Sequence, residues 1–209
     1  DTSTNGMSRQ SVDLLIQNLD GQAGLGCIGA QVDDLNTDDV TLLSVIIDQS
    51  SSMGSVQNDV IDAFNQMTRA LTDSKAADSI IMSTWTFHND SNLLFGYTPI
   101  DQVKDLTNVE YCPSGATALY DAVLDGFTGI VGYGQDLGNN GIRTRSIVVV
   151  ISDGADNVSK NTAAAVRTVA QDLVKQEFYT LAFVGLGDAP TFTQIAKSMG
   201  FPNVLTTQN

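Results

Sequence analysis

An apolar segment is followed directly by a polar one in the stretch Val40-Thr41-Leu42-Leu43-Ser44-Val45-Ile46-Ile47-Asp48-Gln49-Ser50-Ser51-Ser52. Residues 40–47 are a nearly continuous apolar run rich in β-branched side chains, which is typical of a strand buried on both faces of a parallel sheet. Residues 48–52 are polar, and a helical pattern of apolar residues begins directly after them. A strand that passes through a short polar loop into a helix is the repeating unit of an α/β fold.

The same alternation continues to the end of the chain. Apolar patterns predict further strands at residues 80–87, 93–97, 146–151, 180–184 and 203–206, with the 93–97 strand at an edge. Helices are predicted at residues 55–71, 118–130, 162–176 and 192–199, and the glycine-rich polar residues 132–140 are interpreted as a surface loop. This order predicts an α/β fold, a three-layer α/β/α sandwich around a Rossmann-like, mostly parallel sheet.

Residues 1–39 do not share this alternation. They contain a short amphipathic pattern at residues 11–19, a glycine-rich stretch at 21–29 and an acidic stretch at 33–39. We interpret them as an N-terminal extension that lies on a domain formed by residues 40–209. A protective cover and an arm that binds a partner are both consistent with this sequence.

Charge and hydropathy exclude several classes of partner. The chain has 24 acidic and 10 basic residues and a formal net charge of −14, which repels nucleic acid and anionic lipid surfaces and attracts cations. No apolar run approaches the roughly 18 residues that a membrane span needs, so membrane insertion is not expected. Residues 1–10 are polar and show no signal peptide, which says little about location. We expect a cytoplasmic protein, with secretion as the alternative.

The two cysteines, Cys27 and Cys112, are too few for a disulfide framework. They do not have the spacing of a zinc site, and the chain has one histidine, His88, to assist them. We expect two buried thiols, with a single disulfide bridge as the alternative.

Three polar segments are predicted to lie at the carboxyl ends of strands or at the start of a helix. They are residues 48–52, residues 113–117 and residues 152–154. Each alone is typical of a helix N-cap or a turn. In an α/β sheet, however, ligands bind beyond the carboxyl ends of the strands, so the three segments together predict a site.

The side chains of these segments suit a hard metal ion. They offer two carboxylates, Asp48 and Asp153, and three hydroxyls, Ser50, Ser52 and Thr117. Oxygen donors without nitrogen or thiolate suit Mg²⁺, Mn²⁺ or Ca²⁺. Two aspartates brought together without a cation would repel each other and raise each other's pKa. We therefore predict a divalent cation at these five residues, with Mg²⁺ preferred.

These segments resemble the metal-ion-dependent adhesion site of von Willebrand factor A (VWA) domains. The resemblance rests on Asp48-x-Ser50-x-Ser52, on Thr117 within Gly115-Ala116-Thr117-Ala118-Leu119, and on Asp153 within Val150-Ile151-Ser152-Asp153-Gly154. It covers residues 40–206 and is closest in character to short bacterial VWA proteins. Two residues depart from the pattern, because Ser51 and Ala116 stand where the family often has glycine. Many members continue into a final helix, so either the N-terminal extension covers that surface or this sequence is a shortened one.

The resemblance implies a metal-dependent protein–protein interaction module of the adhesion type. Asp48 would orient the first loop and contact the metal at least partly through water, and Ser50 and Ser52 would coordinate it directly. Thr117 and Asp153 would exchange direct and water-mediated contact as the site opens or closes. A protein partner would then supply a Glu or Asp carboxylate to the metal.

An enzyme is the main alternative, and a metal-free structural domain is the other. A Mg²⁺-dependent phosphoryl-transfer enzyme needs a nucleophilic carboxylate or a phosphate cradle with a cationic side chain. Here Ser50 stands where a second aspartate would be, and no GxxxxGK[ST] segment occurs. No Gly-x-Ser-x-Gly turn is present for a hydrolase triad with His88. We therefore predict that the chain is not an enzyme.

Several residues near these segments are given structural roles. We expect Trp85 and His88 to be packing residues, and Asp121 and Asp125 to lie on a solvated helix face. Asn89-Asp90-Ser91 and Asn157-Val158-Ser159 match the short N-glycosylation pattern, which matters only in a secreted eukaryotic protein.

Overall fold

One sheet is the centre of the computed structural model, which describes residues 6–32, 35, 37–187 and 189–207. Residues 33, 34 and 36 of the acidic stretch therefore lie outside the described part. The strand order is β3-β2-β1-β4-β5-β6, and neighbouring strands are parallel except for β2 and β3. The strands are β1 (Asp39–Asp48), β2 (Ile80–Phe87), β3 (Ser91–Pro99), β4 (Arg143–Ser152), β5 (Tyr179–Leu186) and β6 (Asn203–Thr207).

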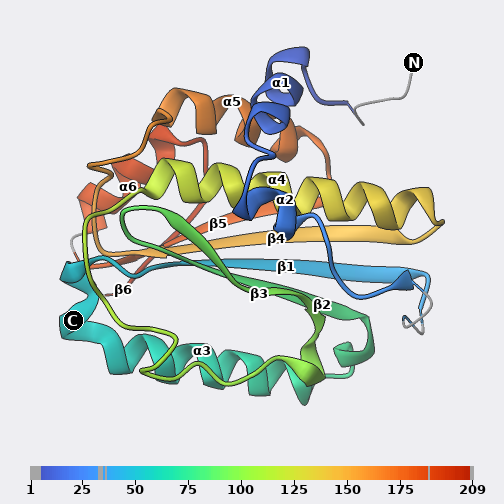
Figure 1. The fold of residues 1–209 in the computed structure, drawn as a ribbon, viewed down its shortest axis with the longest axis horizontal. Coiled ribbons are helices and arrows are strands. Elements are labelled where there is room, and N and C mark those ends of the chain that lie inside the picture. The colour runs from blue at the N-terminus through green and yellow to red at the C-terminus, as the bar shows by residue number, and fades with distance from the viewer. Residues whose placement is uncertain (1–5, 33–34, 36, 188, 208–209) are drawn as a thin grey trace.

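Helices lie on both faces of this sheet and give three layers (Figure 1). One face carries α3 (Gln57–Thr72), and the other carries α4 (Leu119–Asn139), α5 (Ala163–Lys175) and α6 (Ala189–Ser198). Short 3-10 helices occur at η2 (Ser51–Val56), η3 (Ala77–Ser79) and η4 (Ile100–Gln102). The predicted α/β/α sandwich with a mostly parallel sheet is confirmed. None of the helices within the described residues is long and apolar enough to cross a membrane.

Helix α4 is longer than the sequence predicted, and the expected surface loop at residues 132–140 is wrong for most of its length. The helix runs to Asn139 because its second half has core contacts of its own, with Tyr133 and Leu137 both buried. Tertiary packing of this kind outweighs the roughly 1 kcal/mol that each glycine costs in a helix. One of those glycines is also required, since a Cβ at Gly132 would meet Cys27 Sγ at 2.4 Å.

The two faces of β4 are covered unequally. Val148 and Val150 are fully buried on the face that carries α4 and α5. The side chains of Ile147, Val149 and Ile151 point to the α3 face and are only half-buried there. Strand β4 is therefore less covered on the α3 face, because α3 packs over β1 and β2 and leaves the β4 side of the sheet partly open.

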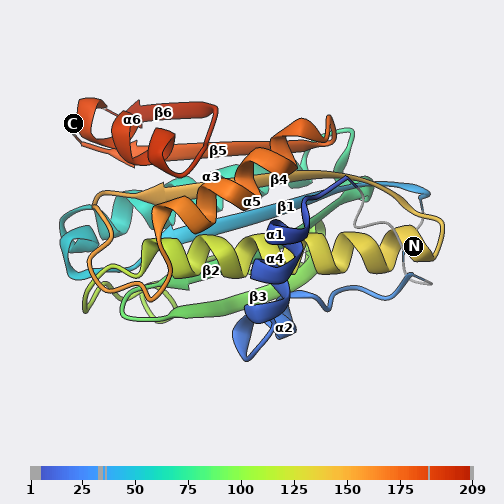
Figure 2. The same ribbon diagram turned by 90° about the horizontal axis from the view of Figure 1, so that it is seen from above.

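The N-terminal helices α1 (Arg9–Gln17) and α2 (Gln22–Gly26) pack on the opposite side of the molecule, against α4, α5 and β3 (Figure 2). They therefore do not cover the open part of the α3 face. The buried carboxylate of Asp172 on α5 accepts hydrogen bonds from Ser8 N (2.8 Å) and Ser11 Oγ (2.7 Å). Helix α2 crosses α4 so closely that a Cβ at Gly129 would meet Gly26 O at 3.0 Å.

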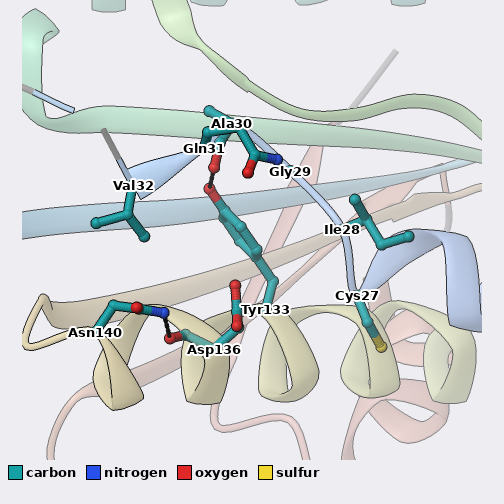
Figure 3. A pocket seen from close by; sticks show the side chains of 9 residues that line it. All are labelled: Cys27, Ile28, Gly29, Ala30, Gln31, Val32, Tyr133, Asp136 and Asn140. Atoms are coloured by element: carbon teal, nitrogen blue, oxygen red, sulfur yellow. Dashed lines mark hydrogen bonds between the residues drawn. The ribbon is translucent and has the colours of Figure 1, made fainter. Parts of the chain in front are cut away.

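The segment after α2 also runs along α4, as Figure 3 shows. Tyr133 OH donates a hydrogen bond to Ala30 O (2.8 Å), and Ala30 N donates to Tyr97 O of the edge strand β3 (3.0 Å). A cavity of about 520 Å³ lies beside these contacts, between residues 27–32 and the second half of α4. Residues far apart in the sequence thus share one interface at this edge of the sheet.

Candidate metal site

Two central parallel strands bring the first and third polar segments together. β1 and β4 are neighbours, with Ile47 opposite Ile151, so Asp48 and Ser152 follow at the same edge of the sheet. Ser152 Oγ donates a hydrogen bond to Asp48 Oδ2 (2.6 Å). The site is therefore fixed to the most extensively paired part of the sheet.

Asp48 is the buried centre of this arrangement. Its side chain is fully shielded from solvent, and Oδ1 accepts a hydrogen bond from Ser50 N (2.8 Å). Burial raises the pKa of Asp48, hydrogen bonds from Ser152 and Ser50 oppose the rise, and the charge of Asp153 adds to it. A nearby cation would favour the ionised form of such a carboxylate.

The serines of the first loop connect Asp48 to Asp153. Ser50 Oγ lies 3.1 Å from Ser52 Oγ, and Ser52 Oγ donates to Asp153 Oδ1 (2.8 Å). Ser50 is buried, Asp153 is half-buried and Ser52 is exposed. The cluster is therefore closed on the side of the sheet and open to solvent on the side of Ser52.

Thr117 reaches the same place from the loop before α4. Its side chain is buried, and its Oγ1 lies 3.9 Å from the position of a Cβ built on Gly154, next to Asp153. Thr117 N donates to Asn157 Oδ1 (2.9 Å), and Asn157 N donates to Thr117 O (3.0 Å). The structure thus brings all five predicted residues to one end of the sheet, from three separate loops.

Further hydrogen bonds hold the first loop in place. Tyr111 OH donates to Asp48 O (2.6 Å), and Ser114 N donates to Gln49 O (2.8 Å). Ser51 Oγ donates to Gly115 O (2.9 Å). Sequence reasoning missed the role of Tyr111, since no local pattern links it to Asp48. The role of Ser152 had a signal, because it directly precedes Asp153 at the end of a strand.

The donor set fits a hard divalent ion. Its side chains supply carboxylate and hydroxyl oxygens alone, which are the ligands that Mg²⁺ and Ca²⁺ prefer. Within the described residues, no cluster of three or more His, Cys, Asp or Glu side chains is placed to hold a metal ion. Any ion at this site would therefore depend on the hydroxyls of Ser50, Ser52 and Thr117 as well as on the two carboxylates.

The residues expected to be structural behave in different ways. Trp85 is fully buried, as predicted, whereas His88 is half-buried and its carbonyl oxygen accepts a hydrogen bond from Ala118 N (2.7 Å). The solvated face predicted for Asp121 and Asp125 is wrong, since both are half-buried. Asp125 accepts hydrogen bonds from Asn18 and Ser91, and burial raises its pKa to about 7.

Both cysteines are free thiols, but their predicted burial is wrong. Cys112 is exposed in the loop after Tyr111, and Cys27 is half-buried where the N-terminal segment crosses α4.

Comparisons with known proteins bear on the fold. No protein-family model matches the chain, and no curated protein matches it in sequence. The PilB minor pilin from Streptococcus sanguinis is 9% identical with a TM-score of 0.56, over 86% of this chain and 59% of that one. The vWF domain of the type V pili tip protein Mfa5 from Porphyromonas gingivalis is 12% identical with a TM-score of 0.55, over 81% of this chain and 90% of that one. The open conformation of the pilus adhesin SpaC from Lactobacillus rhamnosus GG is 10% identical with a TM-score of 0.59, over 83% of this chain and 28% of that one.

These likenesses define the class of fold. Identities of 9–12% relate the folds alone, and the match to Mfa5 spans most of a vWF domain. The chain therefore has a VWA-type fold. It spans 59% of the PilB chain and 28% of the SpaC chain, so it matches a part of each of those proteins.

Proposed function

We propose that the domain binds a divalent cation, Mg²⁺ in preference to Mn²⁺ or Ca²⁺, and through it recognises a Glu or Asp carboxylate of a protein partner. The ligands would be Asp48, Ser50, Ser52, Thr117 and Asp153. The observation that carries the proposal is the convergence of three loops on the fully buried carboxylate of Asp48. A buried carboxylate next to a second one is costly without a compensating charge.

The balance of charge at the site favours an outside ligand. Asp48 and Asp153 together offset the double charge of the ion, and the three hydroxyls are neutral. Hard divalent ions prefer about six oxygen ligands, so five side chains leave room for water or a carboxylate. When bound, the ion supplies a Lewis-acidic position for that oxygen. Ser152 and Tyr111 hold Asp48 and its backbone from behind, and the side near the exposed Ser52 is where a partner has access.

The charge of the chain restricts the partner. A net charge of −14 repels a uniformly acidic surface, so the partner presents one acidic side chain in a neutral or basic surround. The similar folds of a pilin, a pili tip protein and a pilus adhesin support an interaction role rather than an enzymatic one. They also favour secretion, the alternative location, over the cytoplasm.

Titration calorimetry tests the metal, and pull-down tests the partner. Mg²⁺ and Mn²⁺ should each bind the purified chain at about one ion per molecule, and Ser50→Ala and Asp153→Ala should weaken that binding. Capture of partners from a native lysate should require Mg²⁺, should stop with chelator, and should be lost in Asp48→Ala with an unchanged circular dichroism spectrum. Equal capture with chelator and with Mg²⁺ would show that recognition does not pass through a metal.

A further inference from the structure

Two exposed asparagines hold the loop that carries Thr117, one from each side. Asn89, in the loop between β2 and β3, accepts a hydrogen bond at Oδ1 from Ala116 N (2.7 Å). Asn157, in the loop between β4 and α5, accepts one at Oδ1 from Thr117 N (2.9 Å). Consecutive backbone N–H groups of one loop are thus bound by side chains from two other loops.

The contact with Asn89 depends on the backbone at Gly115. This glycine has a φ of +74°, and a Cβ there would meet Asn89 Oδ1 at 2.8 Å. Gly115 O also accepts hydrogen bonds from Ser51 N (3.2 Å) and Ser51 Oγ (2.9 Å) in the first loop. One short segment therefore receives contacts from the loop of Asn89 and from the loop that carries Ser50 and Ser52.

The contact with Asn157 is part of a longer connection between its loop and the start of α4. Ala118, the N-cap of α4, makes no capping bond with its side chain. Ser159 Oγ instead accepts from Tyr120 N and Asp121 N (3.1 Å each). In return, the Asp121 carboxylate accepts from Lys160 N and Asn161 N (2.9 Å each). The loop after Asp153 thus supplies the cap that α4 lacks.

We propose that Asn157 and Asn89 are positioning residues of the metal site. Asn157 ties Thr117 to the loop of Asp153, so that these two ligands approach the ion as one unit. Asn89 holds the loop of Thr117 in a fixed position relative to the loop that carries Ser50 and Ser52. This inference rests on the proposed metal function of the same site.

The physical reason is the cost of ordering a loop. A loop held only at its ends must lose conformational freedom when its hydroxyl meets the ion, and that loss lowers affinity. Hydrogen bonds to Ala116 N and Thr117 N fix the loop beforehand. Outer contacts that orient ligands in this way are worth about 10- to 100-fold in metal affinity.

Mn²⁺ titration of the whole chain tests the proposal. Asn157→Ala should weaken Mn²⁺ binding by about 10- to 100-fold, and Asn89→Ala should also weaken it, by removing one bond each. Asn157→Asp retains an acceptor for Thr117 N and should keep the affinity, even at about 0.5 M salt, where the added charge is screened. The matched control is Val158→Ala, an exposed neighbour in the same loop, which should bind Mn²⁺ as the natural chain does.

The outcomes separate this inference from the function on which it rests. A natural chain that binds no Mn²⁺ overturns both. A natural chain that binds Mn²⁺, with Asn157→Ala and Asn89→Ala binding it equally well, overturns the positioning role alone. The positioning role is also overturned if the variants unfold at a lower temperature without losing affinity, because a merely structural role has that signature. If Asn157→Ala does not fold, Asn89→Ala and Asn157→Asp decide the question.

Discussion

Replacing Asp48 by Asn separates the two consequences of its burial. The variant keeps the shape of the side chain, and its Oδ1 can still accept from Ser50 N. One amide N–H then faces Ser152 Oγ, which can accept that bond and turn its own hydrogen to Gly154 O, 3.2 Å away. The substitution therefore removes the charge, while Oδ1 and one of the two amide N–H groups keep a hydrogen-bond partner. We expect the fold to be retained and the metal response to be lost.

The size of the effect follows from linkage. An ion that binds only the native state at 100 times its Kd adds about 2.7 kcal/mol to the free energy of unfolding. For a chain of this size that corresponds to a rise in Tm of about 5–11 °C, at about 2–4 °C per kcal/mol. The natural chain should show this rise and Asp48→Asn should show none. Without metal, Asp48→Asn should be the more stable protein at pH 7, because burial raises the pKa of the natural carboxyl.

The pH dependence gives a second check with a definite sign. A carboxyl whose pKa is raised in the fold is most favourable when protonated, so its contribution is lost as pH rises through the folded pKa. The stability advantage of Asp48→Asn should therefore shrink as the pH is lowered. Calorimetry with chelator or Mg²⁺ measures both effects, and Asp62→Asn, which removes an exposed carboxylate on α3, is the control. An equal rise in Tm with Mg²⁺ in natural and Asp48→Asn protein would refute this reasoning.

Three further predictions follow from the fold. Val150→Asp should prevent folding, because it buries an unpaired charge, whereas Val149→Asp should give soluble protein with a cooperative unfolding transition; circular dichroism distinguishes them. Gly132→Ala should lower the free energy of unfolding by about 1–3 kcal/mol, because the added methyl group clashes with Cys27 of the N-terminal segment. Gly138→Ala has open space around the added methyl group and should raise the free energy of unfolding by up to about 1 kcal/mol. Denaturant titrations measure both. Burial raises the pKa of Asp172, but hydrogen bonds from Ser8, Ser11 and Lys175 outweigh burial and lower it. Helix α1 should therefore stay bound to α5 above about pH 4 and should loosen as the pH falls through the depressed pKa. Asp172→Asn should loosen α1 at neutral pH, and limited proteolysis measures both changes.

The strands were predictable because each has a strong local pattern. The observed β2 has the predicted bounds, and β1 and β4 extend beyond the predicted ranges at both ends. The second half of α4 was not predictable, because its glycines indicate a loop until their partners are known. Gly132 is next to Cys27, which lies more than a hundred residues earlier. Likewise, an apolar run shows that β4 is hydrophobic, but not that Val149 faces a part of the sheet that α3 leaves open.

At the candidate site, the proposed ligand side chains were predictable from the sequence, but the residues that hold their loops in place by hydrogen bonds were not. The five proposed ligands follow strands or precede a helix, which is where an α/β sheet collects its polar loops. Their roles toward a metal remain a proposal, and their proximity in space is what the structure adds. Asn157 was interpreted only through its glycosylation pattern, since nothing near it in the sequence shows that its amide meets Thr117 N.

The N-terminal segment connects these observations. The division of the chain at residue 40 remains a prediction, yet α1 and α2 pack against α4, the helix that begins directly after the loop of Thr117. Gly26 meets Gly129 near the middle of α4, and the start of that helix is bound to the loop of Asp153 through Ser159 and Asp121. A shift of α4 along its axis would therefore disturb both the N-terminal contacts and the loops of Thr117 and Asp153. The N-terminal segment and the loop of Asp153 therefore contact the same helix, the first near its middle and the second at its start.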